Sequence, residues 1–232
     1  MGHIQRPTLD RIAFENVSVF SSGQVPVLQN VDFELPMDQT IIIQSSNPTH
    51  AVFFLEVLAG RKAPQSGRIM WDDSNIFDFE SQAYPQHEVV GCYFENQRPS
   101  PNQTIQNLLS LHQVSREVIA DLVEHFSWDE ILQRPFKSLT YETQKLLLLS
   151  LATVKNPQML ILEDPAVGIS EHLFLDFLDW IQKGQRCGHM RHFFLTNNHP
   201  SAARHLEAHV MHLEDGLIYF EENQKYKKAV HF

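Results

Sequence analysis

The chain has 232 residues and a mass of 26.9 kDa, the length of one domain or of one core with an inserted lobe. Hydrophobic residues make up 43% and charged residues 20%, which excludes a disordered chain. The formal net charge is -10, and this excludes a general nucleic-acid binder, because phosphate contacts need clustered Lys and Arg. The one basic cluster, Lys225, Lys227 and Lys228, is predicted to be a solvated tail.

Cysteine content and hydropathy predict the compartment. Cys92 and Cys187 are too few for a disulfide framework and are typical of free thiols in a reducing compartment. No apolar run has the length of a membrane-spanning helix, and Met1–Asp10 lacks a signal-peptide core. We therefore expect a cytosolic protein that reaches the inner face of a membrane only through a partner.

The first part of the chain is predicted to consist mainly of strands. Residues 11–36 alternate between apolar and polar side chains in two segments, which predicts antiparallel strands with one buried face. Thr40–Gln44 is short and largely apolar, as strands in the middle of a parallel sheet are. An apolar helix at Thr49–Ala59 follows, closed by Gly60. Further short strands are predicted at 67–71 and 89–94.

The second part alternates helices with strands. Residues 104–137 have a helical pattern typical of an inserted lobe, and a strongly apolar helix is predicted at Thr140–Val154. The remaining predicted elements are a strand at 159–162, a helix at 173–181, a strand at 192–196, a helix at 201–206 and strands at 210–213 and 217–220, the last two joined by the hairpin turn Asp215-Gly216. This order predicts a parallel core sheet with right-handed crossovers.

The strand, loop and helix at 40–60 have the layout of a phosphate-binding loop. Such a loop needs glycines so that its N–H groups can surround phosphates, a Lys for the β- and γ-phosphates, and a Ser or Thr for the metal ion. Here the loop reads Ser45-Ser46-Asn47-Pro48-Thr49-His50-Ala51-Val52-Phe53, and the G-x-x-x-x-G-K-[ST] pattern is absent. This motif alone therefore does not predict a nucleotide site.

Several runs, in a specific order and spacing over residues 11–222, carry a family resemblance. Leu58-Ala59-Gly60 followed by Pro64–Ile69 resembles "L-A-G-x-x-x-P-x-S-G-x-I", and Lys155–Pro165 resembles "K-N-P-x-x-L-L-L-D-E-P". Phe14–Ser18, Val27–Val31 and Val210–Ile218 resemble the opening and closing strands of the same family. The chain thus resembles the ATP-binding-cassette (ABC) ATPase domain, in a degenerate, pseudo-ATPase form.

The resemblance implies an α/β fold of the P-loop NTPase type. It has a mixed core sheet, an antiparallel N-terminal β layer and an inserted helical lobe. We expect a single unit over 1–232, with a core lobe at 11–96 and 151–222, a helical lobe at 97–150 and a tail at 223–232.

The resemblance also assigns nucleotide-binding positions. Phe20 falls where the family stacks adenine, Ala51 on the phosphate-binding Lys, and Val52 on the Ser that ligates Mg²⁺. Pro48 and His50 replace glycines of the loop. The family's nucleotide positions are Phe20, Ser45, Asn47, Thr49, His50, Ala51, Val52, Glu95 and Thr140.

The catalytic positions depart from the family in the same way. Glu95 replaces the Gln that contacts Mg²⁺ and the attacking water. Glu163 falls on the metal-ligating Asp and Asp164 on the general-base Glu, so that the order of the two is reversed. Asn197 replaces the switch His, and Leu139–Thr143 replaces the L-S-G-G-Q signature.

Structural explanations compete with the functional ones at two positions. Pro48-Thr49-His50 reads equally as the start of a helix, since Pro is favoured at the first helical position. A protonated His50 would instead supply the missing positive charge. Thr140 reads equally as the N-cap of the apolar helix that follows it.

The resulting functional prediction is a catalytically impaired ABC subunit. We expect ATP and Mg²⁺ binding to be weak or absent. The partner would be a membrane permease or a second ABC ATPase, in a dimer, with docking near residues 95–111. A slow ATPase in which Glu163 and Asp164 trade roles, and a regulatory protein without a transporter, remain as alternatives.

Overall fold

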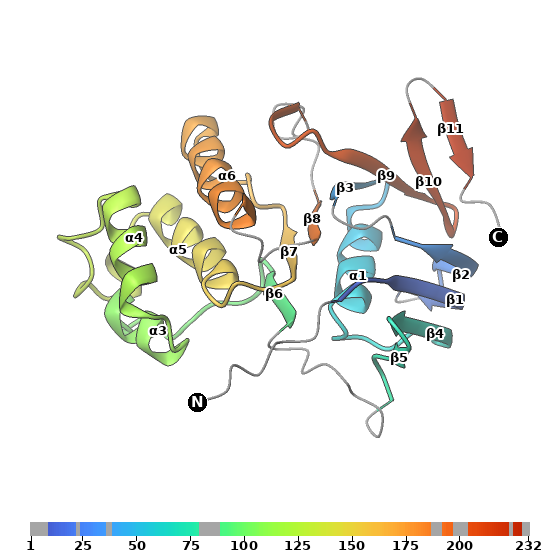
Figure 1. Cartoon of the computed structure of the whole chain (residues 1–232), viewed down its shortest axis with the longest axis horizontal. Coiled ribbons are helices and arrows are strands. Elements are labelled where there is room, and N and C mark those ends of the chain that lie inside the picture. The colour runs from blue at the N-terminus through green and yellow to red at the C-terminus, as the bar shows by residue number, and fades with distance from the viewer. Residues whose placement is uncertain are drawn as a thin grey trace.

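The computed structural model describes residues 9–21, 24–35, 39–78, 89–186, 192–196, 204–222 and 225–228, and its strands form two sheets (Figure 1). The four-stranded sheet has the order β2-β1-β4-β5 and contains β1 (Ile12–Phe20), β2 (Pro26–Glu34), β4 (Ser66–Trp71) and β5 (Ser74–Asn75). The seven-stranded sheet has the order β11-β10-β9-β3-β8-β7-β6. Its strands are β3 (Thr40–Ser45), β6 (Val90–Tyr93), β7 (Met159–Glu163), β8 (His192–Thr196), β9 (His209–Glu214), β10 (Leu217–Glu222) and β11 (Lys225–Lys228).

Strand directions confirm the predicted mixed core sheet and antiparallel layer. β3 runs parallel to β8 and β9, and β7 runs parallel to β6 and β8. β1 is antiparallel to both β2 and β4. The predicted hairpin joins β9 to β10, and Asp215 and Gly216 have φ angles of 51° and 78°, as a tight turn with two left-handed residues requires.

The sequence analysis did not predict two strands, the two-residue β5 and the C-terminal β11. Residues 225–228, predicted to be a solvated tail, form β11 and pair antiparallel with β10. An edge strand has unpaired N–H and C=O groups, and a further strand satisfies them. The lysine-rich composition of this segment gave no sign of that pairing.

The helices lie on both faces of the seven-stranded sheet. They are α1 (Pro48–Leu58), α3 (Ile105–Leu111), α4 (Arg116–Phe126), α5 (Tyr141–Thr153) and α6 (Glu171–Arg186), with a 3-10 turn at Phe136–Ser138. In Figure 1, α1 lies between the two sheets, and α3 to α6 gather on the opposite side of the seven-stranded sheet. Within the described ranges, no helix has both the length and the apolarity needed to cross a bilayer.

The alternation of side chains along the central strands explains why they are almost wholly apolar. On β3, Ile41 and Ile43 belong to the hydrophobic cluster around α1, whereas Ile42 belongs to the cluster around α5 and α6. On β7, Ile161 faces the first cluster and Leu160 the second. Both faces of the sheet are therefore buried, as in other parallel sheets covered by helices. The lobe boundaries near residues 97 and 150 stay a prediction.

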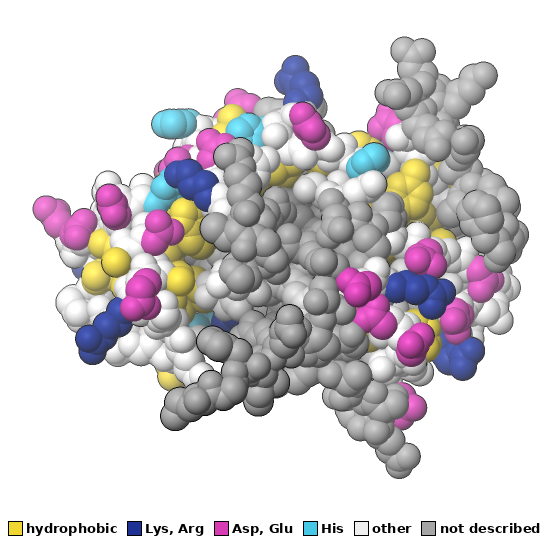
Figure 2. Space-filling model, in the orientation of Figure 1, with side chains coloured by type: hydrophobic (Ala, Val, Ile, Leu, Met, Phe, Trp, Pro, Cys, Tyr) yellow, Lys and Arg dark blue, Asp and Glu magenta, His cyan; other side chains and the backbone are white. Residues whose placement is uncertain are grey.

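Charged side chains cover the outside of the four-stranded sheet. Arg11 Nε lies 3.0 Å from Glu34 Oε2, and Arg68 Nη2 lies 2.9 Å from Glu15 Oε2. Figure 2 shows side chains of both signs close together at this end of the molecule. Exposed pairs of this kind contribute less than about 1 kcal/mol each, so the stability of the sheet rests on its buried face.

Candidate functional site

The loop between β3 and α1 is closed by its own side chains. Asn47 is the N-cap of α1, and its Oδ1 accepts a hydrogen bond from Thr49 N at 3.1 Å. Ser45 Oγ accepts from Asn47 N at 3.3 Å and donates to Leu213 O at 2.8 Å. Pro48, the first helical residue, has no N–H to offer. The interpretation of this segment as a helix start is therefore confirmed.

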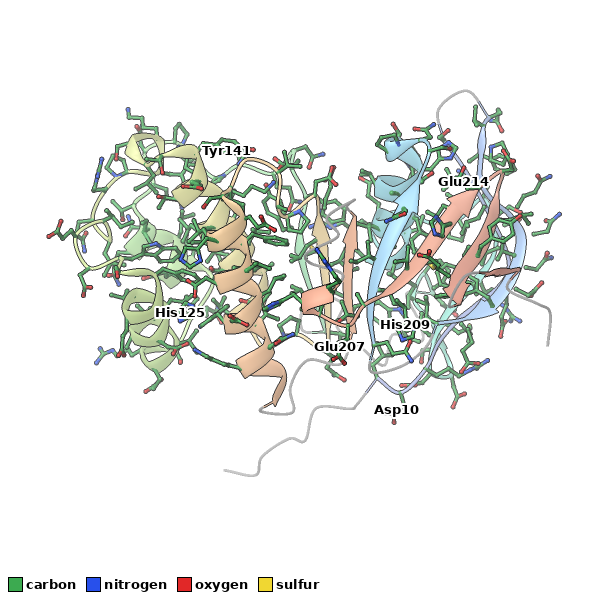
Figure 3. The ribbon with its side chains drawn as sticks, turned by 90° about the horizontal axis from the view of Figure 1, so that it is seen from above. Asp10, His125, Tyr141, Glu207, His209 and Glu214 are labelled. Carbon is green, nitrogen blue, oxygen red and sulfur yellow. The ribbon has the colours of Figure 1, made fainter. Side chains whose placement is uncertain are left out.

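A carboxylate from a distant strand binds the same loop. Ser46 N donates to Glu214 Oε1 at 2.8 Å, and Ser46 Oγ donates to Glu214 Oε2 at 2.6 Å. Glu214 ends β9 and lies beside the ribbon of α1 in Figure 3. An anionic group of the chain itself thus binds a backbone amide of the loop, where a phosphate-binding loop presents its amides to phosphate.

The side chains at the family's Lys and Ser positions pack into the core. Ala51 is 3% exposed and belongs to the cluster around α1, and the partly buried Val52 packs against that cluster. His50 is also buried, and its Nε2 has no hydrogen-bond partner. Phe20, at the end of β1, is half-buried, and its backbone N donates to Gln65 Oε1 at 2.9 Å.

A buried lysine joins three segments at the other end of the sheet. Lys145, on α5, has no exposed surface. Its Nζ forms an ion pair with Glu95 Oε1 and donates to Asp164 O at 2.7 Å. It also lies 5.4 Å from the centre of the Tyr93 ring. We call the ends of β6 and β7 and the start of α5, which Lys145 holds together, the junction.

The two acidic residues at the end of β7 belong to this junction. Glu163 Oε2 accepts a hydrogen bond from Glu95 N at 2.8 Å. Burial raises the pKa of the Glu163 carboxyl above its ordinary value, and the charges of Asp164, Glu95 and Glu56 act in the same direction. Asp164 has a φ of 40°, a left-handed conformation that is uncommon for a residue other than glycine. Within the described part of the chain, no group of three or more His, Cys, Asp or Glu could hold a metal ion.

The segment at the signature position binds the turn that follows β7. Thr140 Oγ1 accepts from Thr143 N at 3.2 Å, which confirms Thr140 as the N-cap of α5. Glu142 Oε1 accepts from Ser170 N at 2.6 Å. The Tyr141 side chain lies over Gly168, where a Cβ would be 2.2 Å from Tyr141 Cε1.

A cleft of about 510 Å³ lies between β6 and the helices, at the place predicted for docking. Its lining includes Arg61, Cys92, Gln97, Arg98, Leu108 and Lys155. Arg61 Nη2 donates to Cys92 Sγ at 3.0 Å, and its guanidinium lies 4.5 Å from the centre of the Phe94 ring. Burial raises the pKa of the Cys92 thiol, and the neighbouring Arg61 partly opposes this. The described residues that line the cleft include Arg and Lys side chains but no Asp or Glu.

The fold brings some of the predicted site residues together and keeps others apart. Glu95, Glu163 and Asp164 meet at the junction. Figure 3 shows Tyr141 and Glu214 far apart along one edge of the molecule, so the signature position and the phosphate loop lie at separate places in a single chain. Asn197 lies outside the described residues.

Two polar residues of the site, Lys145 and Glu214, were not predicted from the sequence. The sequence does carry a sign that Lys145 is buried, because this single lysine precedes the run Leu146–Leu149 inside a strongly apolar helix. No local pattern indicates the contact of Glu214 with Ser46, since the two residues are 168 positions apart.

Comparison with known proteins identifies the family of the chain. The family described as ABC transporter matches residues 28–167. The chain is 22% identical to the sn-glycerol-3-phosphate import ATP-binding protein UgpC of Bordetella avium, over 82% of this chain and 54% of that protein. It is 27% identical to the glucose import ATP-binding protein GlcV of Saccharolobus solfataricus, over 67% of this chain and 47% of that protein. It thus spans about half the length of these curated relatives.

Solved structures agree on the fold. A dimeric bacterial ABC transporter cassette superposes with a TM-score of 0.72 at 16% identity, covering 95% of this chain and 100% of that one. At this identity the likeness concerns the fold alone. The family match extends over more than half of the sequence and includes the phosphate loop, the signature position and the end of β7. The chain therefore belongs to the ABC transporter family, as an ATP-binding cassette domain.

Proposed function

We propose that this cassette is a catalytically impaired ABC subunit that acts as a structural or coupling partner of a membrane permease or of a second ABC ATPase. ABC cassettes in general bind ATP and Mg²⁺, and one structurally similar cassette was solved with ADP and Pi. In this chain we propose that such binding is weak or absent. The observation that carries the proposal is the phosphate loop, whose amides at Ser46, Asn47 and Thr49 bond oxygen atoms of the chain itself.

The charge balance at the loop supports weak nucleotide binding. Replacing the phosphate-binding Lys by Ala51 removes a charge-assisted contact of about 2–3 kcal/mol, or roughly a hundredfold in affinity. Glu214 adds a carboxylate that bonds Ser46 and would repel an incoming phosphate. Restoring the lysine alone would leave that repulsion in place.

The residues present do not fit a magnesium ion. Val52 has no hydroxyl to offer, and Mg²⁺ requires oxygen ligands in near-octahedral geometry. Both carboxylate oxygens of Glu95 already lie in ion pairs, one with Lys145 and the other with Arg98. The raised pKa of Glu163 makes its carboxyl a poorer anionic ligand. We therefore assign no catalytic step to a metal here.

The signature position also supports impaired catalysis. In the family, glycines at this place approach the γ-phosphate bound by the opposite subunit. Here the Tyr141 side chain lies over Gly168, and the Glu142 carboxylate accepts from Ser170 N at 2.6 Å. Any dimer that contains this chain would thus have altered residues at both of its nucleotide sites.

The cleft beside β6 supports a role in protein contacts. It lies where the resemblance puts the docking of a permease, and its charged lining residues are basic. The relatives UgpC and GlcV are import ATP-binding proteins. By analogy we propose a cytoplasmic subunit in a dimer, held at the membrane through its partner, with residues 97–150 as the helical lobe that carries the docking face.

Calorimetric titration with Mg²⁺–ATP tests the proposed loss of nucleotide binding. We expect no saturable heat into the millimolar range, and a low-micromolar dissociation constant would contradict the proposal. The same titration of Glu214→Gln is the matched control. It removes the repelling charge but not the other substitutions, and we expect it to leave ATP binding weak.

Restoring the missing Lys and Ser of the phosphate loop tests whether the signature position is impaired as well. Ala51→Lys with Val52→Ser should leave ATP turnover near background, because Tyr141 and Glu142 still replace the signature glycines. Substantial hydrolysis by this double variant would show that the remaining substitutions are harmless.

Co-purification from the native cell tests the partner. We expect an integral membrane protein or a second ABC ATPase with the wild-type chain, and its loss in Arg61→Glu with Lys155→Glu. The melting temperature of each preparation separates lost docking from lost folding. Recovery of neither class of partner would favour a regulatory protein without a transporter.

A slow ATPase is the second candidate, and the raised pKa of Glu163 favours it. A carboxylate whose pKa is raised toward neutrality is a better general base, so Glu163 could take the role expected of Asp164. Mg²⁺-dependent turnover that disappears in Glu163→Gln but persists in Asp164→Asn would establish this reading. No turnover above background in the wild-type chain would exclude it.

A further inference from the structure

Lys145 is an unusual residue for a protein interior. Among the described residues it is the one Lys, Arg, Asp or Glu that is buried, with 0% of its surface exposed. Charged side chains are almost never fully buried unless they are paired, because an unpaired ammonium in an apolar environment loses its hydration without compensation. The contacts of Lys145 therefore have to account for its burial.

The partners of Lys145 come from two segments outside its own helix. Glu95, just after β6, supplies a carboxylate, and Asp164, just after β7, supplies a backbone carbonyl at 2.7 Å. The Tyr93 ring, on β6, lies 5.4 Å from the ammonium nitrogen, within the range of a cation–π contact. An ammonium has three N–H donors, so two oxygen atoms and one ring face suffice to solvate it.

Glu95 extends this contact to the surface of the cleft. Its other carboxylate oxygen, Oε2, accepts from Arg98 Nη2 at 3.2 Å. Arg98 lines the cleft, and its guanidinium lies 5.6 Å from the centre of the Tyr141 ring. Glu95 N at the same time donates to Glu163 Oε2 at 2.8 Å. One carboxylate thus joins a buried ammonium to a guanidinium in the wall of the cleft.

We infer that Lys145 is an internal cation that takes the place of a divalent metal ion at Glu95 and the end of β7, and that it positions Arg98 in the wall of the cleft. The inference goes beyond the proposed function, because it concerns what orders the junction rather than whether the chain hydrolyses ATP. It makes Lys145 a positioning residue. The order of the junction, and with it the shape of the cleft, then needs neither nucleotide nor metal.

The inference predicts that divalent ions do not stabilise the wild-type chain but do stabilise a variant that lacks the lysine. With Lys145 present, Glu95 and the Asp164 carbonyl are already bonded to a cation, and a second cation would be repelled. Without it, the Glu95 carboxylate and the Asp164 carbonyl lose their donor, and both are oxygen ligands of the kind that Mn²⁺ or Mg²⁺ accepts. A residue that merely filled space would not produce this difference.

The experiment is thermal unfolding of the full chain with and without millimolar Mn²⁺. We expect no Mn²⁺ effect on the wild-type melting temperature. Lys145→Met should melt on the order of 10 °C lower, because it leaves Glu95 Oε1 and the Asp164 carbonyl without their donor, and should regain several degrees with Mn²⁺. If Lys145→Met does not fold, Lys145→Gln replaces it, since the amide can still donate to the Asp164 carbonyl.

Two control variants isolate the cause. Lys137→Met removes an exposed lysine and should match the wild type with and without Mn²⁺. Lys145→Met with Glu95→Gln removes both charges of the pair, so it should melt no lower than Lys145→Met and should show no response to Mn²⁺. Stabilisation of the wild type by Mn²⁺, or no stabilisation of Lys145→Met or Lys145→Gln, would overturn the inference.

Amide hydrogen exchange tests the positioning of the cleft wall. In Lys145→Met, well below its melting temperature, exchange in residues 94–99 should be roughly tenfold faster than in the wild type, while α4 is unchanged. Mn²⁺ should slow the exchange of this segment again. Equal exchange of residues 94–99 in the two proteins would show that Lys145 does not order Arg98.

Discussion

The phosphate loop and the junction are the two polar regions of the site, and they are built in different ways. The loop is exposed, and the acceptors for Asn47 N and Thr49 N lie two residues away along the chain. The junction is centred on a buried ammonium, and 50 residues separate Lys145 from Glu95. Local acceptors of this kind tolerate substitution, although Ser46 N bonds the distant Glu214. A buried charge requires that its partners be correct at the same time.

The packing of the end of α5 on the start of β6 should have the largest effect, because it fixes the two elements whose other ends meet at the junction. A Cβ on Gly91 would lie 1.9 Å from the Ala152 carbonyl oxygen and 2.7 Å from Pro157 Cγ. Gly91→Ala should therefore lower the free energy of unfolding by about 3 kcal/mol in urea titration, because the backbone of α5 would have to move. Gln97→Ala, at an exposed position in the same cleft, should change it by less than about 0.5 kcal/mol. Equal effects of the two changes would mean that α5 is not closely packed on β6.

The contact between Glu142 and Ser170 should have the next largest effect. Glu142→Ala removes a charge-assisted hydrogen bond of 2.6 Å and a negative charge in the first turn of α5, at a cost of about 2 kcal/mol in the free energy of unfolding. Glu117→Ala is the matched control, since Glu117 is an exposed acid in the first turn of α4. It should cost only about 0.5 kcal/mol. If both changes cost the same, the contact with the turn after β7 adds nothing to the helix-end effect.

The local hydrogen bonds of the loop should matter less. Asn47→Ala removes the N-cap of α1 and should destabilise the chain by about 1 kcal/mol in the same titration. Asn47→Ser keeps an oxygen that can accept from Thr49 N and should remain close to the wild type. A loss from Asn47→Ala as large as that from Gly91→Ala would show that the local hydrogen bonds of the loop matter as much as the packing of α5 on β6.

The pH dependence of stability should give the smallest effect. The folded pKa of Glu163 lies above its ordinary value of 4.5, so the folded state binds this proton more strongly than the unfolded state does. Its contribution to stability is present below that ordinary value and is lost as the pH rises through the raised pKa. The melting temperature of Glu163→Gln minus that of the wild type should therefore increase as the pH rises. The opposite trend would show that the hydrogen bond from Glu95 N, which lowers the pKa, outweighs burial.

The sequence predicted most of the elements because their signals are local. The apolar runs at 40–44 and 159–162 are central strands whose alternate residues face different clusters, as at Ile41 and Ile42. The helix start at Pro48, the cap at Thr140 and the hairpin at Asp215-Gly216 each depend on residues within one turn of the chain. The departures from the ABC pattern at Ala51 and Val52 could likewise be read directly from their positions in the sequence.

Only the tertiary structure decided which polar groups meet. The binding of Glu214 to Ser46 depends on β9 lying parallel beside β3, and the burial of Lys145 depends on the ends of β6 and β7 meeting the start of α5. A charged side chain carries no local sign of a partner many residues away. Spacing along the chain determines secondary structure, because backbone hydrogen bonds and caps act over a few residues. Ion pairs and carboxylate–amide contacts are instead set by the register of strands and the placement of helices.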